Sequence, residues 1–170
     1  EWYLYWLDPD LTNVAWFDYP SYGFNRKWIT VSGNMFGGDY YRTVFAIDKK
    51  AVYNGEDSPN HTRFATTEAF TLVPSITYDP NEEDMYLIST SNGNSGGYGY
   101  IKKFKLSGDV NDPIFEYEGA IGVPEPWENS AGNYILPSLE SISAAAQGDI
   151  PADTKVMLTC SDDAGAYPIS

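Results

Sequence analysis

Hydrophobic residues along this chain gather in short segments, separated by turns rich in Gly, Pro, Asn and Asp. Within the segments, apolar positions alternate with polar ones or run on through β-branched and aromatic residues, a pattern typical of β-strands. The pattern predicts strands at 1–7, 13–17, 18–25, 28–32, 40–48, 64–70, 73–78, 85–90, 98–106 and 114–118, and a helical turn at 49–53. The chain is therefore predicted to be all-β.

One arrangement occurs three times along the chain. A strand that contains a Pro-Ser pair is followed by a turn and a second strand, and the pair lies at Pro20-Ser21, Pro74-Ser75 and Pro137-Ser138. Proline is tolerated at the start of a strand, where its missing N–H is not needed by the ladder. In the first two units a glycine-rich loop, an aromatic strand and a weaker fourth strand follow. The repeats begin near residues 18, 72 and 135.

Units of four strands predict a β-propeller of four-stranded antiparallel blades. About two to three blades are present, in a single partial domain that spans residues 1–170. Because known propellers close with about four to eight blades, we expect apolar blade faces that need neighbours. Those neighbours are the remaining blades, from the same longer chain or from other subunits. A β-sandwich with coincidental repeats is the alternative.

The run from Trp16 to Phe36, with 45–49 and 71–79, resembles uncharacterised secreted bacterial proteins predicted to be β-propellers. The likeness covers roughly residues 1–125, and residues 144–154 depart from the pattern. The resemblance implies a propeller fold and a secreted, extracellular or periplasmic setting. Its similarity to sialidase-like propellers is one of architecture only, and fold does not imply activity.

Composition limits the partners. The chain carries a formal charge of −14, from 24 acidic and 10 basic residues. Such a surface repels phosphate backbones, so we expect the chain not to bind nucleic acids. No segment approaches the roughly 18 apolar residues of a membrane span. Cys160 is the single cysteine, so no disulfide can form within the chain, and the opening at Glu1 indicates a mature or partial product.

Propeller geometry predicts a ligand-binding rim. Loops between second and third strands share one face with the connections between blades, and that face usually carries ligands. The loops are Gly33–Asp39, Ser91–Gly97 and Ser161–Gly165, and we expect glycan, peptide or cation contacts from them. The candidate rim residues are Asn34, Asp39, Asn92, Asn94, Asp162 and Asp163, with Trp127 as a surface on which a sugar could stack. The alternative is that these residues only form turns or pack between blades.

Two further sites are suggested by local composition. The acidic turn from 79 to 84 offers Asp79, Asn81, Glu83 and Asp84 as oxygen ligands for Ca²⁺, although it lacks EF-hand spacing and a solvated hairpin is the alternative. This turn is expected at the end of the blades opposite the rim. Asn60 begins an Asn-His-Thr glycosylation sequon.

Catalysis finds little support in the sequence. His61 is the single histidine, which excludes a multi-histidine zinc site within the chain, and the arginines are isolated: Arg26, Arg42 and Arg63. The sequence favours a non-catalytic extracellular segment that acts in binding or assembly, with a protein or glycan partner. The alternatives are part of a glycan-cleaving, sialidase-like enzyme and a structural coat or fibre subunit.

Overall fold

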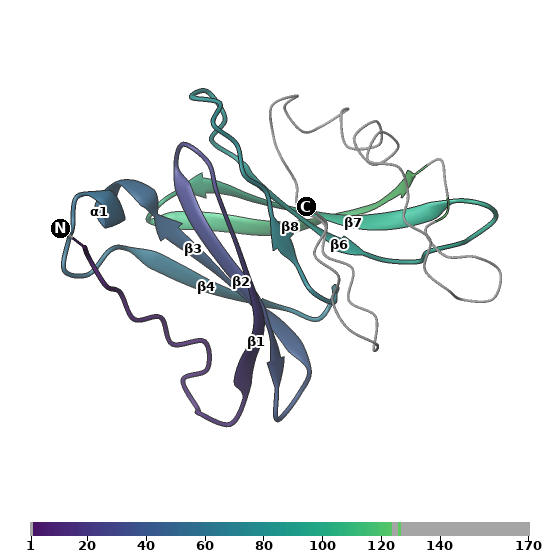
Figure 1. Cartoon of the computed structure of the whole chain (residues 1–170), viewed down its shortest axis with the longest axis horizontal. Helices are drawn as coiled ribbons and strands as arrows, with labels where there is room; N and C mark the ends of the chain where they lie inside the picture. Colours follow the sequence, from purple (N-terminus) through teal and green to yellow (C-terminus); the bar gives the residue numbers. More distant parts are fainter. Residues whose placement is uncertain (1, 124–125, 127–170) are drawn as a thin grey trace.

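The computed structural model describes residues 2–123 and 126, which form two four-stranded antiparallel sheets (Figure 1). The first sheet contains β1 (Trp16–Phe24), β2 (Trp28–Phe36), β3 (Tyr41–Asp48) and β4 (His61–Thr66), in that order. The second sheet contains β5 (Val73–Pro74), β6 (Met85–Thr90), β7 (Gly99–Asp109) and β8 (Asp112–Val123), also in chain order. The prediction of an all-β chain is confirmed. Over the described residues the sheets do not close on themselves.

The one helix of the described residues is α1 (Lys49–Tyr53), a single turn that the sequence predicts at 49–53. Asp48 caps it: the carboxylate accepts hydrogen bonds from the amides of Lys50 (2.9 Å) and Ala51 (3.2 Å). An aspartate at this position satisfies N–H groups that have no partner within the helix. This cap ends β3 and turns the chain toward β4.

Several strand boundaries differ from the predicted ones. Residues 2–7 form no strand. β2 runs on through Gly33 to Phe36, because Gly33, Asn34 and Met35 all pair with β3. β4 ends at Thr66 rather than 70. β5 is only two residues long because the chain then leaves β6 for β1: Ile76 bridges Phe24 in parallel, and the Thr77 amide donates to the Phe24 carbonyl (3.0 Å).

The two sheets pack face to face through one apolar side of each. Side chains alternate across a strand, so Trp28, Val44 and Ala46 on the first sheet face the second sheet. The core cluster comprises Trp28, Val44, Ala46, Ala69, Leu72, Met85, Leu87, Phe104 and Leu106, with Phe64, Val110 and Phe115 packed against it. Phe115 bridges the sheets, with its ring centroid 5.6 Å from Phe104 and 5.4 Å from Phe64.

The outward faces of the sheets differ in chemistry. On the first sheet, the segment 2–15 is attached by hydrogen bonds from Tyr5 to the Val52 carbonyl (3.1 Å) and from Arg63 to the Pro9 carbonyl (2.7 Å). On the second sheet, Glu118 accepts from both Lys103 (3.0 Å) and Lys105 (3.4 Å). A small apolar cluster of Ile101, Ile121 and Val123 lies on the same sheet. The outward face of the second sheet therefore combines an ion-paired cluster with a small apolar one.

Candidate functional site

Four aromatic rings lie in a row at the end of the first sheet where the β2–β3 loop and the β4–β5 connection are found. The ring centroids of Trp16 and Phe36 are 5.2 Å apart, those of Phe36 and Tyr40 5.1 Å, and those of Tyr40 and Phe70 5.7 Å. Trp16 is 59% exposed, Tyr40 39% and Phe70 45%, while Phe36 is half-buried. We call these four residues the aromatic row.

Strand register brings the row together. Trp16 and Phe36 are direct partners in the β1–β2 ladder. Met35 pairs with Tyr41, so Phe36 and Tyr40 stand at the two ends of the short loop that follows β2. Phe70 joins them from the connection between the two sheets. The row is thus assembled from segments far apart in the sequence.

Arg42 lies beneath the row. It is the second residue of β3 and only 3% exposed. Its guanidinium carbon is 4.0 Å from the Tyr40 ring centroid and 5.2 Å from that of Phe70. None of the described residues accepts a hydrogen bond from this side chain, and its Nε atom is buried without a partner. Burial lowers the pKa of Arg42, and the neighbouring Tyr40 opposes that change.

Asn34 occupies a different place from the one expected of a rim residue. It lies inside β2 opposite Arg42 and is 2% exposed. Its Nδ2 donates to Thr71 Oγ1 (3.0 Å), and its Oδ1 accepts from the Thr71 amide (3.0 Å). The prediction that Asn34 lies on a loop is wrong, because pairing with β3 carries β2 past it. The side chain instead anchors Thr71, whose φ of 54° sets the backbone beside Phe70.

The other rim candidates lie on loops where the structure describes them. Asp39 is exposed in the β2–β3 loop, next to Tyr40 of the row. Asn92 and Asn94 are exposed in the β6–β7 loop and shape its turn: Asn92 Oδ1 accepts from the Asn94 amide (3.1 Å), and Asn94 Oδ1 from the Gly97 amide (3.3 Å). A ligand role for these three remains a prediction. Trp127, Asp162 and Asp163 lie outside the described residues.

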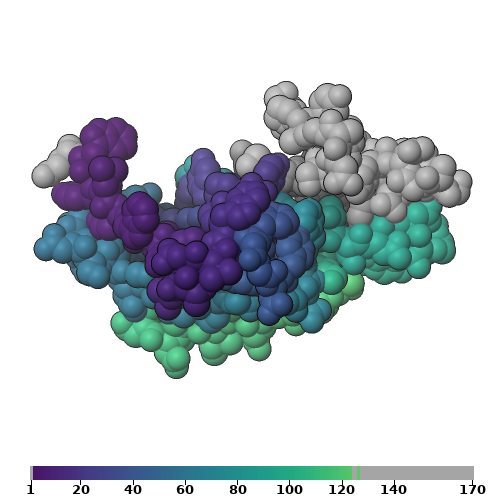
Figure 2. Space-filling model, turned by 90° about the horizontal axis from the view of Figure 1, so that it is seen from below, coloured from purple at the N-terminus to yellow at the C-terminus, as the bar shows by residue number. Residues whose placement is uncertain are grey.

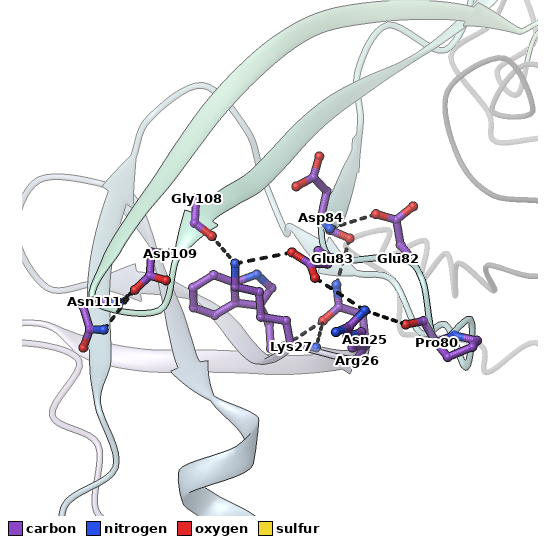
Figure 3. A network of polar contacts seen from close by, with 11 residues as sticks. Asn25, Arg26, Lys27, Pro80, Glu82, Glu83, Asp84, Gly108, Asp109 and Asn111 are labelled. Carbon is purple, nitrogen blue, oxygen red and sulfur yellow. Dashed lines mark hydrogen bonds and ion pairs between the residues drawn. The ribbon is translucent and has the colours of Figure 1, made fainter.

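The acidic turn lies at the opposite end of the sheets, as expected, and several of its polar groups are engaged in contacts (Figure 3). Asp79 accepts from the Asn81 amide (2.8 Å), and the Asp84 amide donates to Glu82 Oε1 (2.8 Å). Glu83 approaches the basic residues of the β1–β2 turn, at 3.5 Å from Arg26 and 4.0 Å from Lys27. Across residues 2–123 and 126, no group of three or more His, Cys, Asp or Glu side chains could hold a metal ion. The calcium site gains no support.

Asn60, the sequon residue, is exposed at the same end as the acidic turn. Its Nδ2 donates to the Val110 carbonyl (2.7 Å) and to Asn111 Oδ1 (3.2 Å), and so joins the β3–β4 connection to the β7–β8 turn. Glycosylation of Asn60 remains a prediction.

Sequence reasoning missed the aromatic row and the position of Arg42. Part of the row could have been found from the β1–β2 hairpin. If the pairing of its two strands is extended away from the turn at 25–27, Trp16 comes to lie near Phe36.

In the described part of the chain, no helix is long and apolar enough to cross a membrane. No protein-family model, curated protein or solved structure matches the chain.

Proposed function

We propose that the two sheets are successive blades of a β-propeller and that the chain is a non-catalytic extracellular segment that binds a ligand. Each sheet is a meander of four strands in chain order, which is the topology of a blade. The first strands of the two sheets lie side by side and run parallel where Phe24 bridges Ile76. This arrangement suits neighbouring blades whose first strands surround a common axis.

The observation that carries the binding function is the aromatic row. Its rings are partly exposed and follow one another at centroid separations of 5.1–5.7 Å, tilted to or stacked on their neighbours, so they offer a continuous apolar surface. It lies at the end of the sheets where propellers usually carry ligands. Flat aromatic faces suit the flat, apolar faces of sugar rings, and a glycan is therefore the favoured ligand.

The remaining blades are the second class of partner in this proposal. Three apolar side chains in the N-terminal segment are almost fully exposed: Trp2 (95%), Leu4 (96%) and Trp6 (90%). Figure 2 shows this segment, in purple, projecting from the body of the two sheets. Apolar surface of this kind marks contact sites, and a neighbouring blade, from a longer chain or another subunit, would cover it.

Titration of the chain with soluble oligosaccharides, followed by tryptophan fluorescence, tests the binding function. We expect saturable binding that is weakened at least tenfold in Trp16→Ala and Tyr40→Ala. Tyr53→Ala is the matched control, because Tyr53 is 68% exposed on α1 at the other end of the first sheet. Equal binding by all three variants would contradict the proposal. Light scattering in the same buffer reports whether copies of the chain assemble.

A further inference from the structure

Arg42 is only 3% exposed, and its Nε atom is buried without a hydrogen-bond acceptor. Burying a charge without a partner is strongly unfavourable, since the group loses its hydration and gains no compensating bond. Other cations of this chain find an oxygen: Lys103 pairs with Glu118 (3.0 Å), and Lys49 donates to the Asn25 carbonyl (2.6 Å). Arg42 has only the faces of Tyr40 and Phe70. Its five N–H donors therefore remain available to an acceptor that comes from outside the described residues.

The position of Arg42 selects the charge of a ligand. A cation beneath an aromatic ring is attracted by the negative face of its quadrupole. A second cation above the same ring would be repelled by the first, whereas an anion would be attracted. The exposed rings of Tyr40 and Phe70 are therefore poor platforms for cationic ligands and good ones for rings that carry a negative group.

We propose that the aromatic row binds a ring-shaped ligand whose carboxylate is taken up by Arg42. The inference rests on the proposed binding function of the same row and adds the chemical class of the ligand. A guanidinium presents a planar fork that matches a carboxylate with two parallel hydrogen bonds, and charged bonds of this kind are strong ones. The ring that bears the carboxylate stacks on Tyr40 and Phe70.

The loop before Tyr40 can widen the way to the guanidinium. Tyr40 and Phe70 lie against the guanidinium, and of its three nitrogen atoms Nε is the one buried without a hydrogen-bond partner. Gly37 (φ 118°) and Gly38 precede Tyr40, and glycine permits backbone conformations that other residues resist. On the other side Asn34 holds Thr71 through two hydrogen bonds, which keeps Phe70 in place. If one ring shifts to admit a carboxylate, we therefore expect it to be Tyr40.

Two ligand sources share this chemistry, a uronic acid residue of a glycan and an aromatic acid. The test measures binding of the 170-residue chain to trigalacturonate, to its neutral methyl ester and to benzoate, by calorimetry at fixed salt. We expect trigalacturonate to bind at least tenfold more tightly than the ester. Arg42→Met should remove that preference, and Arg42→Lys should keep part of it, because lysine retains the charge without the fork.

Arg26→Met is the matched control, since it deletes the same charge from the exposed β1–β2 turn at the other end of the sheets. It should leave the preference unchanged. Thermal melting separates loss of binding from loss of folding: Arg42→Met should melt at a higher temperature than the parent chain, because it removes an unpaired buried charge. A preference for trigalacturonate over its ester that persists in a folded Arg42→Met chain would overturn the inference.

The remaining outcomes each decide one point. Equal binding of the acid and the ester, both weakened by Tyr40→Ala, would overturn the inference and leave the binding function standing. Binding of benzoate alone, lost in Arg42→Met, would support the inference with an aromatic acid as the ligand. Binding of none of the three would overturn the inference and count against the aromatic row as a binding site.

Discussion

The side-chain nitrogen of Asn25 donates a 2.9 Å hydrogen bond to the backbone carbonyl of Asp84, and this bond joins the β1–β2 turn of one sheet to the β5–β6 turn of the other (Figure 3). Asn25 is completely buried. Its Oδ1 accepts from the amides of Lys27 (2.8 Å) and Trp28 (2.7 Å), so one side chain both closes its own turn and holds the neighbouring sheet.

Replacing Asn25 by Ala should therefore destabilise the whole two-sheet unit. Three hydrogen bonds are lost and buried backbone groups are left unpaired, so we expect the free energy of unfolding to fall by about 3 kcal/mol. Urea denaturation followed by fluorescence measures the change. Asn81→Ala is the control, because Asn81 is exposed in the adjoining acidic turn. A loss no greater than that of the control would refute the coupling of the two turns.

Gly23→Ala tests the junction of β1 and β5. A Cβ atom built on Gly23 would overlap the Ser75 carbonyl oxygen and lie 2.7 Å from Pro74 Cβ. The strands would have to separate, and overpacking of this kind costs about 3 kcal/mol. Gly38→Ala should be tolerated, because its Cβ would meet only Val14 Cγ1 at 3.9 Å. Chemical denaturation of the two variants side by side checks this, and equal stabilities would contradict it.

Leu87→Ala tests whether the sheets form a single cooperative unit. Leu87 on β6 is fully buried in the core shared with Trp28 and Val44 of the first sheet. Its truncation should cost about 3 kcal/mol, from lost transfer energy and the cavity left behind. The loss should appear equally by fluorescence and by circular dichroism, in one transition. Leu11→Ala, at a position 72% exposed, should change stability by less than about 0.5 kcal/mol. Separate transitions for the two probes would mean that the sheets unfold independently.

Asp10 should make the stability of the N-terminal segment depend on pH. Its carboxylate accepts hydrogen bonds from the amides of Thr12 (3.1 Å), Val14 (2.8 Å) and Ala15 (2.6 Å) and from the Thr12 hydroxyl (2.7 Å). These bonds, led by the one from Ala15, hold the pKa of Asp10 well below its usual range. Because the pKa of Asp10 is lower in the folded state, its carboxylate stabilises the fold at pH values above the unfolded pKa of about 3.9. This stabilisation is lost as the pH falls below that value toward the folded-state pKa.

Asp10→Asn should thus lower the melting temperature at pH 7, and the gap to the parent chain should narrow as the pH falls from about 4 toward 2. Hydrogen exchange at the amides of Val14 and Ala15 should accelerate in the variant at neutral pH. Asp39→Asn, in an exposed loop, serves as the control. A gap that stays constant across this pH range would show that the Asp10 carboxylate does not hold the segment.

Much of the fold could be predicted because its signals are local. A run of apolar residues bounded by turn-forming residues predicted a strand at 85–90, where β6 lies. The same kind of pattern predicted two successive groups of four strands, as the structure has them. The helical turn at 49–53 could be predicted as well, and the Asp48 cap that starts it involves only neighbours in sequence. Because successive connections of a meander alternate between the two ends of a sheet, the order of the predicted strands was enough to predict that the acidic turn lies at the end opposite the β2–β3 loop.

What the tertiary structure decided is which groups meet. Residues 2–7 have a strand-like pattern but form no strand, because a pattern cannot supply a partner for the ladder. Asn34 has the composition of a loop residue but is buried, since pairing with β3 extends β2 past it. Arg42 stood alone in the sequence, and only the packing of Tyr40 and Phe70 over it shows a desolvated cation beneath exposed rings. Side chains drawn from three segments create that environment, and its chemistry depends on distances and burial that no single segment determines.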